Sequence, residues 1–245
     1  MHDIQWQSFY QGELQSVYAL LVVPIAFLAF RLVASPDASR AVVPDAARFV
    51  ALFTIVFAIE TIIDPIATGP LIKKTALKDT AATSLIPFLF VYLGDLRVLL
   101  LAVGVARQGR GLSQNLRWAA GMTLLIPVFA GTGFALARWI SPQAHGQILW
   151  MLYEFGFLGL CIGLGRHWAP SSFSDQPATV AFLQSLFGYS AAYYALWLGA
   201  DLLIVVGGLD LGWALRIVPN QLYYAFWIVF VYWRFFSSVG SKADR

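Results

Sequence analysis

Charged side chains are scarce in this sequence: they make up 12% of its 245 residues, whereas hydrophobic residues make up 59%. A soluble domain usually carries about 25% charged residues. Several apolar runs also exceed the roughly 18 residues that mark a membrane-spanning helix. The composition therefore excludes a soluble globular protein. It predicts one integral, multi-pass membrane domain over residues 1–245, surrounded by lipid and placed in a bacterial inner membrane.

Cysteine and histidine are also rare. The single cysteine, Cys161, allows no internal disulfide and lies in an apolar run, where a small core residue is expected. The three histidines, His2, His145 and His167, lie at helix ends and in loops, so neither haem ligation nor a histidine zinc site is expected. The HExxH, P-loop and GxSxG motifs are absent. We therefore predict no cofactor and no metal, although carboxylate oxygens leave Mg²⁺ or Ca²⁺ binding open.

Helices are the predicted form of the apolar runs, because an open strand cannot satisfy its backbone in lipid and the alternation of a barrel is missing. The fold class expected is an all-α, seven-transmembrane-helix bundle. The seven predicted spans have approximate limits of 16–34, 48–68, 82–106, 117–139, 147–165, 179–207 and 212–236. Residues 1–15 are predicted to form an interfacial segment, and residues 237–245 a short tail.

Basic residues between the predicted spans and near their ends predict the orientation. With the N-terminus outside, the inner segments hold Arg31, Arg40, Arg48, Arg107, Arg110, Arg117, Arg166, Arg234, Lys242 and Arg245, and the outer segments hold Lys73, Lys74, Lys78 and Arg138. Ten against four favours an outer N-terminus and a cytoplasmic C-terminus. The same rule accounts for the net charge of +3, so no nucleic acid partner is expected.

Seven helices, an outer N-terminus and this length resemble the architecture of microbial rhodopsins. A retinal Schiff base needs a lysine in the last span. The four lysines, at positions 73, 74, 78 and 242, all lie outside the predicted spans. Retinal is therefore excluded, and the resemblance is limited to architecture.

Seven charged residues lie at least four residues inside the limits of the predicted spans. The acids are Glu60, Asp64, Asp95, Glu154 and Asp201, and the bases are Arg97 and Arg216. Each charge near the centre of a bilayer costs at least about 2.5–3.5 kcal/mol. Protonation, ion pairing or a bound cation must therefore neutralise these acids.

Aromatic and polar residues recur at helical spacing in the last two spans. One face carries Ser190, Tyr194, Trp197 and Asp201, and another carries Arg216, Asn220, Tyr224 and Trp227. We expect these faces and the acids to line a cavity in the outer half of the bundle. The residues expected there are Glu60, Asp64, Asp95, Glu154, Asp201, Arg216, Asn220, Tyr194, Trp197, Tyr224 and Trp227. The structural alternative is that ion pairs among them only tie the helices together.

Three classes of function remain open. The first is a transporter or channel for a cation, an organic cation or a proton-coupled solute, with the aromatic rings facing the cation. The second is a sensor or accessory subunit that binds a small ligand without moving it, which leaves a homo-oligomer or a membrane partner open. The third is an intramembrane enzyme in which a carboxylate acts as general base on a lipid or small amphiphile.

Overall fold

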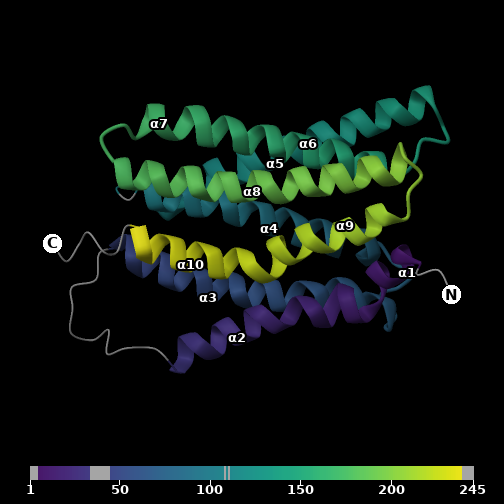
Figure 1. Ribbon diagram of the computed structural model, residues 1–245, viewed down its shortest axis with the longest axis horizontal. Helices are drawn as coiled ribbons and strands as arrows, with labels where there is room; N and C mark the ends of the chain where they lie inside the picture. The colour runs from purple at the N-terminus through teal and green to yellow at the C-terminus, as the bar shows by residue number, and fades with distance from the viewer. Residues whose placement is uncertain (1–4, 34–44, 108, 110, 239–245) are drawn as a thin grey trace.

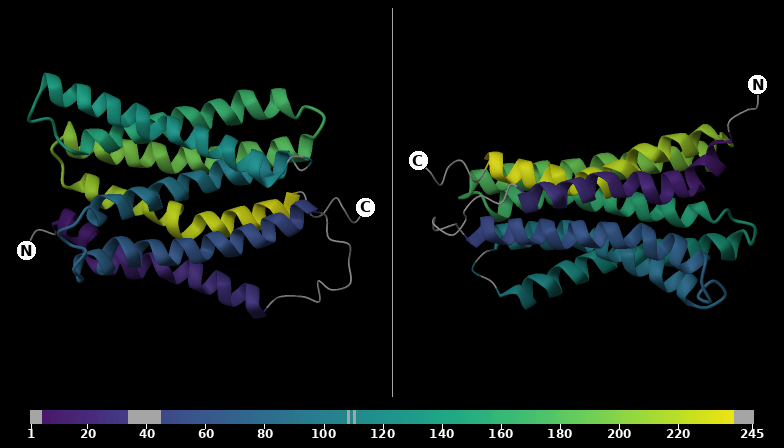
Figure 2. Two further views of the ribbon diagram at one scale, coloured as in Figure 1. Left: turned by 180° about the vertical axis from the view of Figure 1, so that it is seen from behind. Right: turned by 90° about the horizontal axis from the view of Figure 1, so that it is seen from below.

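The computed structural model describes residues 5–33, 45–107, 109 and 111–238. Every regular element in these ranges is a helix, and none is a strand. Figure 1 shows the long helices running side by side along one axis, with α1 at one end of the bundle and the last turn of α10 at the other. The views from behind and below in Figure 2 show the same elongated bundle.

Four short π-helical segments, written η, interrupt or extend the α-helices. In chain order the elements are α1 (Trp6–Gln11), η1 (Leu14–Tyr18), α2 (Ala19–Val33), α3 (Asp45–Ile66), η2 (Ala67–Leu71), α4 (Ala82–Ala106), α5 (Leu112–Ile140), α6 (Gln147–Gly163), η3 (Leu164–Trp168), α7 (Ala169–Ser172), α8 (Pro177–Val205), α9 (Leu211–Asn220), η4 (Gln221–Phe226) and α10 (Trp227–Ser238).

Six helices in the described part of the chain are long and apolar enough to cross a membrane. They are Leu14–Val33, Asp45–Leu71, Ala82–Ala106, Leu112–Ile140, Gln147–Ser172 and Leu211–Ser237. Large apolar side chains such as Leu32, Val33 and Ile140 are exposed on the bundle, as lipid-facing residues are. The all-helical, membrane-type fold is confirmed.

The predicted span 179–207 corresponds to α8, which has 29 residues but is not among those six helices. Tyrosines and the buried Asp201 lower its hydropathy. The predicted tail beyond residue 238 lies outside the described residues, as do residues 1–4 and the basic residues Arg40, Arg110, Lys242 and Arg245.

Aromatic side chains fill much of the interior. Phe182 of α8 meets Phe235 of α10 with 5.4 Å between ring centroids, and both are fully buried. Between α8 and α9 the chain turns at Gly208, whose φ of 62° favours glycine. Gly212 then lets α9 approach α8, because a Cβ there would lie 2.6 Å from the carbonyl oxygen of Ala200. This tight hairpin brings the end of α8 against the start of α9.

Segment η4 follows Pro219, which lacks an N–H and disturbs the helical ladder around it. Side chains from other helices use carbonyl groups of this π-helical segment. The Tyr189 hydroxyl donates to the carbonyl of Leu222 at 2.9 Å, and Arg97 Nη2 donates to the carbonyl of Tyr223 at 2.6 Å. π-helical turns are frequent at functional sites, and this one lies beside the cavity described next.

Candidate functional site

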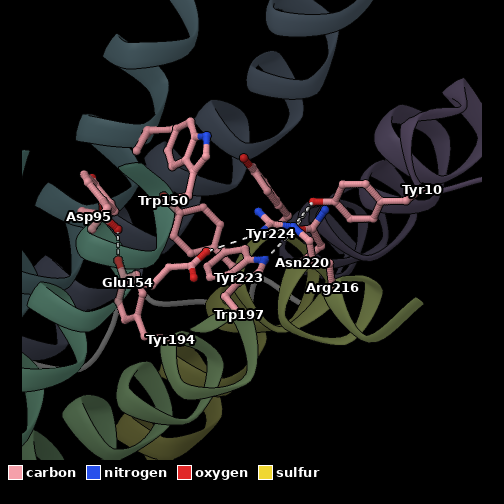
Figure 3. A pocket seen from close by; sticks show the side chains of 12 residues that line it. Tyr10, Asp95, Trp150, Glu154, Tyr194, Trp197, Arg216, Asn220, Tyr223 and Tyr224 are labelled. Carbon is pink, nitrogen blue, oxygen red and sulfur yellow. Dashed lines mark hydrogen bonds and ion pairs between the residues drawn. The ribbon is translucent and has the colours of Figure 1, made fainter. Parts of the chain in front are cut away.

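A cavity of about 170 Å³ lies between α1, α4, α6, α8, α9 and η4. Seven of the residues expected from the sequence line it, namely Asp95, Glu154, Tyr194, Trp197, Arg216, Asn220 and Tyr224. Five further residues complete the lining: Tyr10, Val91, Trp150, Tyr153 and Tyr223. Figure 3 shows Asp95 and Glu154 at one side of this cavity and Tyr10, Arg216 and Asn220 at the other.

Asp95 is the buried acid at the inner side of the cavity, and only 2% of it is exposed. The hydroxyl of Tyr153 on α6 donates to its Oδ2, and the hydroxyl of Tyr194 on α8 donates to its Oδ1. Within the described residues, no lysine, arginine or histidine forms an ion pair with Asp95. Hydrogen bonds from neutral hydroxyls therefore orient this carboxylate without balancing its charge.

The residue before Asp95 is glycine for a steric reason. A Cβ on Gly94 would lie 1.8 Å from the hydroxyl oxygen of Tyr223. The missing side chain lets the Tyr223 ring reach α4 next to Asp95 and close that part of the lining. The Tyr223 hydroxyl is buried there and has no hydrogen-bond partner in the part of the chain that the structure describes.

Arg216 carries the positive charge of the cavity. Its Nη1 pairs with Asp201 and lies 3.6 Å from Glu154 Oε1, and its Nε donates to the Tyr10 hydroxyl at 3.3 Å. Asp201 is fully buried and also accepts a hydrogen bond from Gln147 Nε2 at 2.7 Å. Asp201 does not line the cavity, contrary to expectation, because its carboxylate is enclosed by these two partners. We call Arg216, Asp201, Glu154 and Tyr10 the Arg216 cluster.

Asn220 joins α1 to α8 across the cavity wall. Its Oδ1 accepts hydrogen bonds from Trp197 Nε1 at 3.1 Å and from the Tyr10 hydroxyl at 3.3 Å. Both donors therefore hold the amide of Asn220 in one orientation. Figure 3 shows the Tyr10 ring extending from α1 toward Asn220 and Arg216.

A second charged group, the Arg97 cluster, lies outside the cavity. The side chain of Arg97 is 1% exposed and its Nη1 lies 3.8 Å from Glu60 Oε2. The same nitrogen donates to Thr61 Oγ1 at 3.0 Å, and Nη2 donates to the Tyr223 carbonyl. We define the Arg97 cluster as Arg97, Glu60, Thr61 and Trp227. The Arg97 side chain of α4 therefore meets partners from α3, η4 and α10.

Trp227 belongs to this second cluster and does not line the cavity. It is fully buried, and the guanidinium carbon of Arg97 lies 4.6 Å from its ring centroid. Three-residue spacing from Tyr224 placed both rings on one face of an α-helix. Tyr224 lies within the π-helical segment η4 and Trp227 begins α10, so the angle between the two side chains differs from that of a regular α-helix and Trp227 points elsewhere.

Glu60 and Asp64 share a face of α3, but neither lines the cavity. Asp64 is buried, and its carboxylate accepts a hydrogen bond from Thr68 Oγ1 at 3.3 Å. The expectation that all five acids line one cavity is therefore wrong for Glu60, Asp64 and Asp201. Helical spacing shows which residues share a face of a helix, but it does not show which other helix packs against that face. Among the described residues, no group of three or more His, Cys, Asp or Glu residues could hold a metal ion.

The five lining residues that the sequence analysis missed carried weak signals. Tyr153 precedes Glu154 in the chain, so a search for hydroxyls beside buried acids would have found it. Tyr10 is 210 residues from Asn220 in the chain, and no local pattern connects them. Trp150 lies near the start of α6, four residues before Glu154, and it is exposed.

No protein-family model, curated protein or solved structure matches this chain. The chemistry of the site must therefore be read from its own residues. Three acids (Asp95, Glu154 and Asp201) face one base (Arg216) in and around the cavity. Aromatic side chains line the same cavity, among them Tyr194, Trp197 and Tyr224.

Proposed function

We propose that this protein is a small membrane transporter or channel that binds a cation, an organic cation or a proton-coupled solute in the cavity around Asp95. The observation that carries the proposal is the buried Asp95 carboxylate, which has two tyrosine donors and no ion-pair partner among the described residues. A buried charge of this kind is stable only when something neutralises it. A bound cation or proton would do so.

The size and the rings of the cavity support a small ligand. Its volume of about 170 Å³ lies below the roughly 300–1,000 Å³ of pockets for drug-sized molecules. Phe157 stacks behind Tyr194 with 5.2 Å between ring centroids, so the ring that meets the ligand is held rigidly. Cations gain about 0.5–2 kcal/mol from such ring faces, depending on desolvation.

We further propose that α8 is a seventh span, with the N-terminus outside and the C-terminus in the cytoplasm of a bacterial cell. The helix is as long as α5 and packs between α6 and α9, so it needs little lipid-facing apolar surface of its own. The basic residues Arg48, Arg107 and Arg117 then belong to the cytoplasmic end. Reporter fusions after residue 174 and after residue 208, on the two sides of α8, test this topology, since the first should report the cytoplasm and the second the outside.

The binding test uses a carboxylate-to-amide pair. Asp95→Asn keeps the volume of the side chain and removes its charge, and Asp64→Asn does the same to a buried acid outside the cavity. Thermal unfolding of each purified variant would be followed with sodium, potassium, ethylammonium and tetramethylammonium at constant ionic strength. We expect at least one cation to raise the melting temperature of the parent and of Asp64→Asn but not that of Asp95→Asn. At a cation concentration of 100 times Kd, the free energy of unfolding should rise by about 2.7 kcal/mol.

Equal stabilisation of all three proteins would refute the cation site at Asp95. If the site binds as expected, flux of the same cation into liposomes separates transport from sensing. Binding without flux would replace the transporter by a ligand-binding sensor or accessory subunit.

A further inference from the structure

A second cavity lies on the α1 side of the first. Its volume is about 290 Å³, and its lining includes Ser16, Thr68 and Lys73. We call it the vestibule. We call the first cavity, around Asp95, the inner cavity. The vestibule shares three lining residues with it, namely Tyr10, Asn220 and Tyr224. These three side chains are therefore the wall between the two spaces.

Tyr10 is the part of this wall that comes from α1. Its hydroxyl bonds to Asn220 and to Arg216, and its ring packs on Trp213 with 5.5 Å between centroids. All three partners lie on α9. Removing Tyr10 would leave the Arg216 Nε and one side of the Asn220 amide facing the vestibule.

Helix α1 is attached to the bundle by a few polar contacts. No residue of α1 is buried. Asp210, at the start of α9, accepts hydrogen bonds from the backbone N–H groups of Trp6 at 2.6 Å and Gln7 at 3.2 Å. On the other side Glu13 pairs with Lys74 at 2.7 Å, and this contact raises the pKa of the Lys74 ammonium. Elements with few buried apolar contacts open at low free-energy cost.

We propose that α1 is a gate and that Tyr10 is the gating residue between the vestibule and the inner cavity. The inference rests on the proposed function, because a gate is needed only where a solute passes. In the closed state Tyr10 bridges Arg216 and Asn220. When α1 swings away from Asp210, the two spaces become one path from the end of the bundle to Asp95.

The test measures access to the inner cavity directly and needs no ligand. In a Cys161→Ala background, Val91→Cys places one thiol in the lining of the inner cavity, outside the vestibule. The probe is aminoethyl methanethiosulfonate, a water-soluble cationic thiol reagent, and mass spectrometry gives the rate of modification. Tyr10→Ala should raise this rate about tenfold or more, since it removes two hydrogen bonds and the ring that closes the wall.

Three further variants separate the gate from general loosening. Tyr10→Phe keeps the ring and loses the hydroxyl, so its rate should fall between those of the parent and Tyr10→Ala. Asp210→Ala releases α1 from outside either cavity and should also raise the rate. Phe9→Ala removes an exposed ring from the same helix and should leave the rate unchanged.

The gate is refuted if the Val91→Cys thiol is modified at the parent rate in both Tyr10→Ala and Asp210→Ala, while the same thiol reacts fully in the denatured protein. It is also refuted if Phe9→Ala raises the rate as much as Tyr10→Ala. If the modification rates change as expected but the protein binds no cation, the proposed function is refuted and the gated path to Asp95 still stands.

Discussion

The two arginines inside the bundle differ in what surrounds their charge. Arg97 is 1% exposed and is held by a hydroxyl, a backbone carbonyl, an acid at 3.8 Å and two aromatic rings. Arg216 is 11% exposed, pairs with two acids and lies against a cavity. The guanidinium of Arg97 thus meets mostly neutral groups, whereas that of Arg216 meets carboxylates.

Because of this difference we assign Arg97 to the packing of the bundle and propose Arg216 as part of a functional site. The contacts of Arg97 join α4 to α3, η4 and α10, and Arg97 is not among the residues that line the cavity around Asp95. Those of Arg216 leave the cavity open and connect it to α1 through Tyr10. A buried arginine in a membrane bundle is therefore a functional candidate only when part of its environment is empty space, a condition that the sequence does not record.

The largest expected effect is on stability, at Arg97. Arg97→Met should destabilise the protein by about 3–5 kcal/mol, because it leaves the partly buried Glu60 without its ion pair and the Tyr223 carbonyl without its donor. Unfolding in mixed micelles of increasing SDS content measures this change. Arg138→Met, which removes an exposed arginine, should have little effect. Equal midpoints for Arg97→Met and the parent would contradict the structural role.

An intermediate effect is expected in the Arg216 cluster, as a coupling between two residues. Arg216→Gln leaves Asp201 with only Gln147 as a partner, and Asp201→Asn leaves Arg216 with Glu154. The double variant should therefore be more stable than the sum of the single changes predicts, by about 0.5–3 kcal/mol. The same unfolding experiment on the four proteins gives this coupling. Strict additivity would show that the pair contributes nothing.

The smallest effect concerns the π-helical turn between the two clusters. Tyr189→Phe removes the hydrogen bond to the Leu222 carbonyl and should cost about 0.5–1.5 kcal/mol. The ring still stacks on Phe230, so packing should survive. Cation binding at Asp95 should weaken slightly if the turn positions Tyr223 and Tyr224, and should not change if it serves stability alone. Calorimetric titration of the variant distinguishes the two.

The sequence by itself determined the membrane character and the helices. Uninterrupted apolar runs of sufficient length allow no other structure in lipid, because only a helix satisfies its backbone internally. Helical spacing also placed Tyr194 and Trp197 on one inward face, and both line the cavity. These properties depend on residues close together in the chain, so periodicity reveals them.

Only the tertiary structure decided which faces meet. Asp95 and Asp64 carry the same chemistry in similar apolar surroundings, yet one lines a cavity and the other does not and is bonded to Thr68, four residues along the chain. The π-helical turn after Pro219 separated Trp227 from Tyr224. Tyr10 reached Asn220 across 210 residues. These contacts depend on how whole helices pack against one another. Helix packing is a sum of weak contacts between segments far apart in the chain, which local sequence patterns do not encode.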